Sequence, residues 1–315
     1  MSKISKSNTL PDVKRVVGEK FTLGEFVYQF ISYLIFGLFA LICILPFYYL
    51  FTVSISSNDL VRKGVLLLYP QGIHFTNYIN AFRLDGLWQS ALISLSRTVI
   101  GTVLTVLTSA WLGYAFTKQE MWKRSFWYKF IIITMYFNAG IIPIFLTMHY
   151  LGLTNTFWIY IVWFVIAYYI ILCKTFIESI PASLEESAKL DGAKYLSVFF
   201  YIILPLSKPI LATISVFVAV GHWNSYMDTV IYIRDTSLHT LQYTLFKYLN
   251  SATALAAAMS NPNSASLVGV DLASIVPPMS IKMTIAVIVS LPVLFVYPFF
   301  QRFFVKGIML GAIKG

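Results

Sequence analysis

The chain has 315 residues, of which 58% are hydrophobic and only 11% are charged, and its formal net charge is +10. Soluble domains carry about 25% charged residues, so this composition excludes an ordinary soluble domain and indicates a membrane protein with several spans. A positive net charge is also typical of nucleic-acid-binding proteins, and the distribution of that charge along the chain separates the two explanations.

Six apolar stretches are long enough to form transmembrane helices, each of which needs roughly 20 residues to cross the hydrocarbon core. The first stretch is too long and too weakly marked for cleavage to be a signal peptide, so we predict that it stays in the membrane. The sequence therefore predicts an all-α, polytopic membrane protein with spans near 26–55, 88–116, 126–149, 154–177, 205–233 and 281–304.

Most of the basic residues lie on one side of these predicted spans. They precede the first span, follow the sixth, and flank the connections between spans two and three and between spans four and five. Because positively charged loops stay in the cytoplasm, this bias places both termini there and predicts a lipid bilayer, with no nucleic acid, as the partner of the charge. The opposite side carries only Arg62, Lys63, Arg83, Arg234, Lys247 and Lys282.

The predicted organisation has three parts. Residues 1–25 form a cytoplasmic tail, residues 26–304 form the six-helix transmembrane domain, and residues 305–315 form a second cytoplasmic tail. Two long loops interrupt the domain, an inner one at 181–208 and an outer one at 234–280. The Ala-, Ser- and Asn-rich run 251–265 in the outer loop predicts either a short helix with a flexible tip or a disordered segment.

The inner loop carries the signals of a short polar helix. Ser183 is followed three residues later by Glu186, which is the pattern of a capping box. The carboxylates of Glu185 and Glu186 fall in the first turn, where they complement the helix dipole. Gly192 is placed to end the helix, because glycine most easily adopts the left-handed conformation of a C-terminal cap.

A second short helix is predicted from about residue 194 to residue 202. Ser207 then caps the fifth span, and Pro209 opens it. Together the two short helices predict a helix–turn–helix on the inner membrane face. Such a segment either docks a soluble partner or rests on the lipid headgroups, and the local sequence leaves both alternatives open.

The same loop carries Glu186-x-Ala188-x-x-Asp191-Gly192 and, after nine residues, Ile202-x-Leu204-Pro205. This pattern resembles the EAA loop of permease subunits in binding-protein-dependent ABC importers. Ser187 departs from the family's more common alanine, small for small. Two other segments, Trp223-Asn224 and the stretch 301–307, are similar to the carbohydrate-uptake branch of this family, which is MalG-like (maltose permease). The region 138–150 and the outer loops resemble its LplC-like sub-branch for oligosaccharides and polysaccharide fragments. The loop residues that the resemblance assigns to contact with the ATPase are Glu186, Ser187, Ala188, Asp191, Gly192, Ala193, Leu204 and Pro205.

This resemblance implies a specific set of partners and roles. The chain would pair with a second homologous permease subunit, and two ATPase subunits would lie below the pair. The helices at 183–202 would fit a cleft on one of these ATPases. Closure of the ATPases would then switch the spans from inward-facing to outward-facing. The C-terminal segment with Lys306 and Gly307 would reach toward the ATPases. By their position the outer residues 250–271 would either probe an extracytoplasmic sugar-binding protein or form an ordinary linker.

Energy for transport has to come from such a partner. The chain contains no Gly-x-x-x-x-Gly-Lys-Ser/Thr sequence, so it has no P-loop for nucleotide phosphates. Its four histidines offer no pattern of catalytic or metal-ligating residues. We therefore predict a transport subunit and not an enzyme, without a cofactor or metal of its own, and the resemblance assigns ATP and Mg²⁺ to the partner ATPase. The abundance of Lys, Asn, Ile, Tyr and Phe indicates a low-GC bacterium, in which the binding protein would be a lipoprotein.

Several polar residues fall within the predicted spans. His222, Trp223, Asn224 and Tyr226 lie past the middle of the fifth span, where polar side chains are expected to face the bundle or a wet cavity. An aromatic ring beside hydrogen-bonding groups suits a sugar, so these residues are candidates for the substrate path, and interhelical hydrogen bonding is the alternative.

The third and second spans supply two further polar residues. Asn138, followed by Ala139-Gly140 and Pro143, predicts a kinked or broken third span and is another candidate for the substrate path. Simple helix packing is the alternative role for that break. Arg97 is expected to snorkel toward the outer end of the second span.

Three other functions agree less well with the sequence than a sugar permease does. A self-sufficient secondary transporter would need ionisable residues in several spans, and apart from His222 and Arg97 the predicted spans hold almost none. A membrane enzyme would need a set of catalytic residues that the sequence does not offer. A permease for peptides or other non-sugar solutes is disfavoured by resemblance alone.

Overall fold

The computed structural model describes residues 23–63, 68–260 and 279–311, and for Glu25, Arg62, 251–260 and 296–311 it describes the backbone only. Every regular element in these ranges is a helix, which confirms the all-α prediction. The chain forms two compact units, residues 1–49 and 50–315. Of the first unit, the described part is α1 (Leu23–Ile55), whose last residues belong to the second unit.

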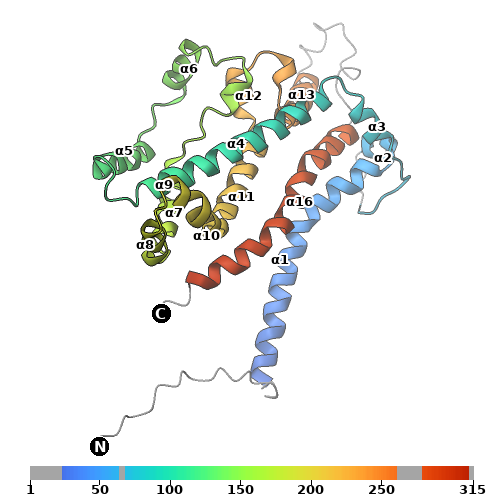
Figure 1. The fold of residues 1–315 in the computed structure, drawn as a ribbon. Coiled ribbons are helices and arrows are strands. Elements are labelled where there is room, and N and C mark those ends of the chain that lie inside the picture. The colour runs from blue at the N-terminus through green and yellow to red at the C-terminus, as the bar shows by residue number, and fades with distance from the viewer. Residues whose placement is uncertain (1–22, 64–67, 261–278, 312–315) are drawn as a thin grey trace, which may run out of the picture. The chain divides into compact units, whose positions relative to one another are not determined.

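The second unit contains the remaining helices, labelled in Figure 1. Some are long enough to cross a membrane and others are single turns that connect them. In chain order they are α2 (Asn58–Arg62), α3 (Thr76–Phe82), α4 (Leu87–Ala115), α5 (Arg124–Tyr136), α6 (Ile141–Tyr150), η1 (Phe157–Tyr160), α7 (Ala167–Glu178), α8 (Ala182–Leu190), α9 (Tyr195–Val198), η2 (Phe199–Ile203), α10 (Leu204–Leu206), α11 (Lys208–Asn224), α12 (Met227–Tyr232), η3 (Thr236–Leu238), α13 (Leu241–Ser260) and α16 (Met279–Gly311).

Helix α4 is the centre of this unit, because α7 and α11 both pack along it and α16 packs on α11 (Figure 1). The buried face of α4 consists mainly of small and polar residues. Small residues let helix backbones approach closely, which is how helices associate in membranes. One such close approach is at Gly113, where an added Cβ atom would lie 2.7 Å from the Cβ atom of Cys173 on α7.

We expect Gly113→Ala to push α4 and α7 apart. The new methyl group would also lie 3.0 Å from the backbone nitrogen of Lys174, which cannot move without shifting the helix. Overpacking of this kind costs about 1–3 kcal/mol, so the thermal unfolding midpoint of the purified chain should fall. Gly221→Ala on α11 is the control, because its Cβ would meet nothing within 4 Å. Equal midpoints for the two variants would contradict this account of the α4–α7 packing.

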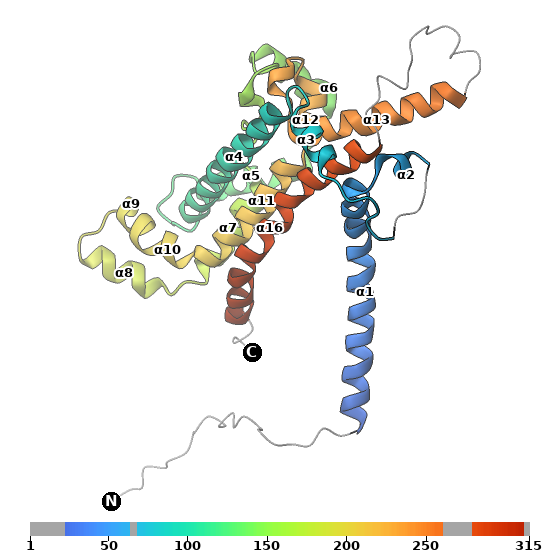
Figure 2. The ribbon, with the colours of Figure 1, turned by 90° about the vertical axis from the view of Figure 1, so that its right-hand side faces the viewer.

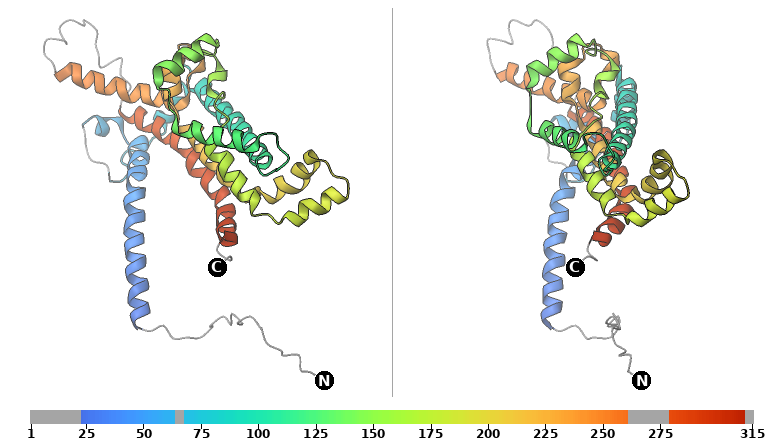
Figure 3. Two further views of the ribbon diagram at one scale, coloured as in Figure 1. Left: turned by 90° about the vertical axis from the view of Figure 1, so that its left-hand side faces the viewer. Right: turned by 60° about the vertical axis from the view of Figure 1, so that its left-hand side comes forward.

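Two of the described helices, α1 and α4, are individually long and apolar enough to cross a membrane, and up to four spans result if each bent pair is one span. One bent pair is α5 and α6, which meet at 119° (Figure 3). The break lies at residues 137–140, as the sequence predicted from Asn138 and Gly140. Gly140 has a φ of 83°, and its N–H donates to Oδ1 of Asn138 at 2.9 Å, so the glycine and the amide together form the turn.

The predicted fourth and fifth spans are not continuous helices. Between residues 154 and 177 the chain forms the short helix η1 and then α7, with six non-helical residues, 161–166, between them. Several of these are β-branched, which lowers helix propensity, and the tertiary contacts of Tyr160 hold η1 in place. The fifth span ends at Asn224, and α12 follows after a break at Ser225 and Tyr226.

The predicted tails and the outer loop are described in part. Residues 1–22 of the predicted N-terminal tail and residues 312–315 of the C-terminal one lie outside the described residues. Helix α16 continues through 305–311, so this part of the predicted tail is helical. In the outer loop, residues 251–260 belong to α13, and residues 261–278 lie outside the described part.

Candidate functional site

The predicted helix–turn–helix is present as a hairpin of α8 with the segment α9–η2–α10. Figure 2 shows this hairpin beyond the ends of α7 and α11, the two helices that it connects. The segment 195–206 meets α11 at an angle of 77°, and the bend falls at Ser207. The hairpin therefore does not continue the direction of α11, and many residues of its first half, α8, are exposed.

Gly192 ends α8 as the sequence predicted. Its φ is 84°, which is the left-handed conformation. Its N–H donates to the carbonyl of Lys189 at 3.0 Å, and the N–H of Ala193 donates to the carbonyl of Ala188 at 2.9 Å. This pair of hydrogen bonds is a Schellman motif, which satisfies the last carbonyls of the helix and turns the chain into α9.

The predicted capping box is absent. Helix α8 begins at Ala182, with Pro181 at the N-cap and no side-chain cap hydrogen bond. Ser183 is thus already inside the helix, whereas an N-cap residue needs a non-helical backbone for its hydroxyl to reach the free N–H groups. Ser207 does occupy the N-cap of α11, with Pro209 in the first turn, but its hydroxyl also makes no cap hydrogen bond.

The hairpin presents two different faces. Ala188 and Ala193 are half-buried and pack against a core formed by α4, α7, η2 and α11. The opposite face is exposed, and its most exposed large apolar side chain is Leu190, at 89%. A single exposed leucine is common on protein surfaces and does not by itself mark a binding site. The exposed neighbours of Leu190 from the sequence pattern are Glu186, Ser187, Asp191 and Gly192.

The second half of the hairpin differs from the single helix predicted for 194–202. After one turn of α-helix the chain widens into a π-helical turn at Phe199–Ile203, and Leu204 and Pro205 follow in the short helix α10. Phe199 is buried, and its ring meets the ring of Trp111 on α4 at 5.0 Å. The π turn and this aromatic contact fix the second half of the hairpin to α4. Such turns occur frequently at functional sites.

Glu185 is a residue whose role sequence analysis missed. The sequence placed it beside Glu186 as a second carboxylate near the helix dipole. In the structure the two point differently: Glu186 is exposed, whereas the carboxylate of Glu185 forms ion pairs with Lys118 and Lys189. The only sequence signal for this ion pair was a basic residue in the loop after α4, such as Lys118, together with two adjacent acidic residues in the predicted helix.

The polar residues at the end of α11 have separate environments. His222 packs directly on Gly101 of α4, where an added Cβ atom would lie 2.5 Å from Nε2 of the imidazole. Trp223 Nε1 donates to the carbonyl of Val289 on α16 at 2.9 Å. Tyr226 stacks on Phe246 with ring centroids 4.6 Å apart, and Asn224 is exposed. The sequence grouped these residues in one site. In the structure, His222, Trp223 and Tyr226 each contact a different neighbouring helix, namely α4, α16 and α13.

An apolar groove of about 400 Å³ lies between α4, α11 and α16. Of the candidate residues at the end of α11, Trp223 lines it. The groove has few hydrogen-bonding groups, so it offers an apolar surface. The other lining residues are Leu95, Thr98, Val99, Thr102, Val103, Ser215, Ala219, Val220, Pro292 and Val293.

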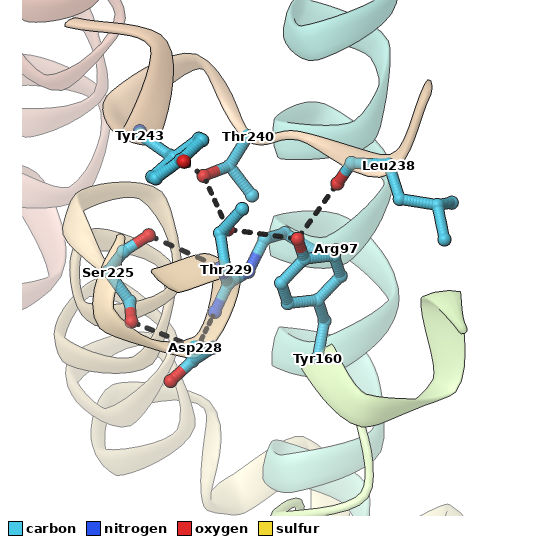
Figure 4. A network of polar contacts seen from close by, with 8 residues as sticks. All are labelled: Arg97, Tyr160, Ser225, Asp228, Thr229, Leu238, Thr240 and Tyr243. Atoms are coloured by element: carbon cyan, nitrogen blue, oxygen red, sulfur yellow. Dashed lines mark hydrogen bonds and ion pairs between the residues drawn. The ribbon is translucent and has the colours of Figure 1, made fainter. Parts of the chain in front are cut away.

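The prediction that Arg97 snorkels to the membrane surface is wrong. Its side chain is only 2% exposed, and Nη2 donates to Oδ2 of Asp228 at 2.6 Å (Figure 4). Nη1 donates to the carbonyl of Ser225 at 3.2 Å, and the guanidinium lies 4.4 Å from the centre of the Tyr160 ring. These partners explain the difference, because a buried charge is tolerated when it is paired and hydrogen-bonded.

The network around Arg97 joins four segments of the chain. The hydroxyl of Tyr160 on η1 donates to the carbonyl of Leu238 at 2.8 Å and contacts the hydroxyl of Thr229 on α12 at 2.9 Å. Thr229 in turn contacts the hydroxyl of Thr240, just before α13, at 3.1 Å. Figure 4 shows that these side chains converge on the break between α11 and α12. The network therefore holds the end of α11 against α4.

The remaining candidates lie elsewhere. Asn138 is exposed at the break between α5 and α6 and is hydrogen-bonded locally. Lys306 and Gly307 belong to α16, but the Lys306 side chain lies outside the described part of the structure. The structure thus brings together the loop residues, and it keeps Asn138 on an element separate from the residues at the end of α11.

The hairpin belongs to a helical chain in which two described helices, α1 and α4, are long and apolar enough to cross a membrane. The chain belongs to the family of inner membrane components of binding-protein-dependent transport systems, whose model matches residues 105–310. It is therefore a transport permease, and the hairpin lies within the matched region.

Three similar proteins indicate which kind of transport permease this chain resembles. The polygalacturonan/rhamnogalacturonan transport system permease protein YtcP of Bacillus subtilis (strain 168) is 37% identical over 88% of this chain and 95% of its own. Protein LplC of the same organism is 33% identical over 92% of this chain and 95% of its own. A crystal structure of a bacterial ABC transporter involved in the import of the acidic polysaccharide alginate superposes with a TM-score of 0.78 at 30% identity, over 91% of this chain and all of that one.

Proposed function

We propose that the chain is the permease subunit of an ATP-driven ABC importer and forms half of the translocation path for an oligosaccharide or a polysaccharide fragment. The observation that carries the proposal is the exposed hairpin, which bears the loop pattern from Glu186 to Pro205 in a chain that belongs to the permease family. A self-sufficient transporter would not need such a hairpin, and the family takes its name from its dependence on a binding protein.

The proposed topology has six spans, both termini in the cytoplasm and the hairpin on the cytoplasmic side of a bacterial inner membrane. The distribution of basic residues supports this orientation, because Lys118, Lys189 and Lys194 all lie on or next to the hairpin. The long outer loop that contains α13 then faces outward. In this topology α8 is the coupling helix.

Two ATPase subunits are the proposed partners of the hairpin. The chain itself has no P-loop, so ATP and Mg²⁺ would bind to the ATPases. Exposed Leu190 and Glu186 supply an apolar contact and a charge for a cleft on the ATPase surface. The end of α16 with Lys306 and Gly307 would lie near the same partner.

In the membrane, a second homologous permease subunit would complete the path. On the outer side, an extracytoplasmic sugar-binding protein, a lipoprotein, would deliver the substrate. The residues at the end of α11 and Asn138 are the proposed path residues. Trp223 is the best placed of them, because its ring lines the groove between α4, α11 and α16. The relatives that transport polygalacturonan and alginate support an acidic polysaccharide fragment as the substrate.

The test is reconstitution of the chain in proteoliposomes with the second permease, the ATPase and the binding protein. We expect ATP-dependent uptake of labelled oligogalacturonides and no uptake of a peptide of similar size. Oligosaccharide uptake by the purified chain alone, without an ATPase, would contradict the proposal. So would peptide uptake at the same rate as that of the sugar.

Glu186→Lys is expected to abolish this uptake while the chain remains folded in the membrane. Glu186 is exposed, so its replacement removes no internal contact of the described chain but reverses a charge on the docking face. The matched control is Glu178→Lys, an exposed glutamate at the end of α7, outside the hairpin. Co-purification of the ATPase with each variant measures docking directly. Normal ATPase binding and uptake by the Glu186 variant would show that this face does not dock the ATPase.

A further inference from the structure

The coupling helix α8 is joined to the central helix α4 by a polar contact that the loop pattern does not include. The carboxylate of Glu185 accepts from Nζ of Lys118, three residues beyond the end of α4. Both side chains are only 15% exposed, so water screens this ion pair poorly. It is therefore a stronger link than an ordinary surface pair.

Two further groups hold the same carboxylate in place. Lys189, one turn along α8, lies with Nζ 3.2 Å from Oε1 of Glu185. The hydroxyl of Tyr114, in the last turn of α4, donates to Oε1 at 3.4 Å. Lys118 in turn lies over the ring of Tyr114 at 4.2 Å, so the cation has a second partner on α4. Several connected polar contacts, and not one ion pair alone, thus join α8 to the end of α4.

The electrostatics keep this set ionised at neutral pH. Burial raises the pKa of the Glu185 carboxyl, but the hydrogen bonds from Lys118 and Lys189 lower it, and the net shift is downward. The carboxylate is therefore charged whenever the protein works near neutral pH.

The position of the contact gives it a mechanical consequence. Helix α4 (Leu87–Ala115) ends three residues before Lys118, and it carries Arg97, whose network holds the break between α11 and α12. A movement of α8 that is carried into α4 thus reaches the region of His222 and Trp223 through one helix. Without the ion pair, the aromatic contact of Phe199 with Trp111 would remain, but it joins α4 to the other half of the hairpin.

We propose that Glu185 is a positioning residue, which through its ion pair with Lys118 transmits the displacement of the coupling helix α8 to α4. This inference rests on the proposed function, because it requires an ATPase that moves the hairpin. Adjacent glutamates then have divided roles: Glu186 faces the partner, and Glu185 ties the same helix to the transport domain.

The experiment compares the amount of sugar moved per ATP hydrolysed in the reconstituted importer. We expect Glu185→Gln and Lys118→Met each to lower this ratio about ten-fold, since allosteric couplings are worth roughly 5- to 150-fold. The ATPase should still co-purify and hydrolyse ATP. Because the two residues act as one unit, the double variant should show the same loss as either single one. The control is Glu178→Gln, which breaks an ion pair with Lys174 that lies within α7 and joins no two helices.

The charge swap Glu185→Lys with Lys118→Glu separates transmission from packing. If the ion pair carries the movement, the swap should restore at least half of the wild-type ratio. A swap that restores nothing, or single variants with an unchanged ratio, would overturn the inference. These outcomes are distinct from failure of the proposed function, in which the wild-type importer itself would show no ATP-dependent sugar uptake.

Discussion

Gly192→Val is expected to abolish ATP-dependent uptake, because it removes the turn that sets the two halves of the hairpin against each other. The φ of 84° at this position is costly for any residue with a Cβ atom, by about 1–2 kcal/mol, and a β-branched side chain tolerates it least. Relaxing the backbone would break the hydrogen bonds from Gly192 and Ala193 to the end of α8. The segment α9–α10 would then leave its place against α4.

A matched variant isolates the backbone from the size of the side chain. A Cβ at Gly192 would meet nothing within 4 Å, so no internal clash accompanies either substitution. Asparagine is close to valine in size but adopts the left-handed conformation far more readily. We therefore expect Gly192→Asn to retain most of the uptake. If the asparagine and valine variants lost uptake to the same degree, a steric contact with the ATPase, and not the turn, would explain the effect.

The features that could be predicted from the sequence are those that depend on local chemistry. Gly192 and the break at Asn138 and Gly140 were predicted because glycine at a positive φ, together with a nearby amide, is a short-range signal. The long apolar helices α1 and α4 were predicted from composition alone. The prediction of a capping box was wrong for a local reason too. Helix α8 begins directly after Pro181, before Ser183, and the pattern of Ser183 and Glu186 does not specify which residue is the N-cap.

The features that the sequence could not provide depend on contacts between distant residues. Arg97 and Asp228 are 131 positions apart, so an arginine within an apolar stretch gave no indication of its partner. Snorkelling was the expected solution for an unpaired charge. The direction of Glu185 is similar, because it differs from Glu186 only by its rotation on α8, and the lysine that selects it lies 67 positions earlier.

The same logic explains why the end of α11 was predicted only in part. The polarity of His222, Trp223 and Tyr226 indicated that they face the helix bundle, and in the structure each of them contacts another helix. Their individual partners, Gly101, the carbonyl of Val289 and Phe246, come from three different segments. A motif identifies the residues that matter together, but the packing of α4, α13 and α16 decides which surfaces they form.

We expect Asp228→Ala and Arg97→Met, which each remove one partner of the same ion pair, to lower the unfolding free energy by different amounts. Asp228→Ala would leave a guanidinium that is 2% exposed with only the Ser225 carbonyl and the Tyr160 ring, so we expect a loss of about 3–5 kcal/mol in unfolding free energy. Arg97→Met would leave Asp228, which is 32% exposed and accepts from the Ser225 hydroxyl at 2.9 Å. Water can reach that carboxylate, so the loss should be smaller, about 1–3 kcal/mol.

The double variant Arg97→Met with Asp228→Ala tests the cause of the difference. If the large loss comes from a stranded buried cation, removing that cation as well should return the stability close to that of Arg97→Met alone. The measurement is unfolding by SDS in mixed micelles, with the pair Lys174 and Glu178 as control, for which we expect a coupling below about 1 kcal/mol. Additive losses, or a larger loss for Arg97→Met than for Asp228→Ala, would contradict this account.

Because the network holds the break after α11, the Asp228 variant should also lose uptake. The double variant should regain stability without regaining transport if the position of that break governs the path.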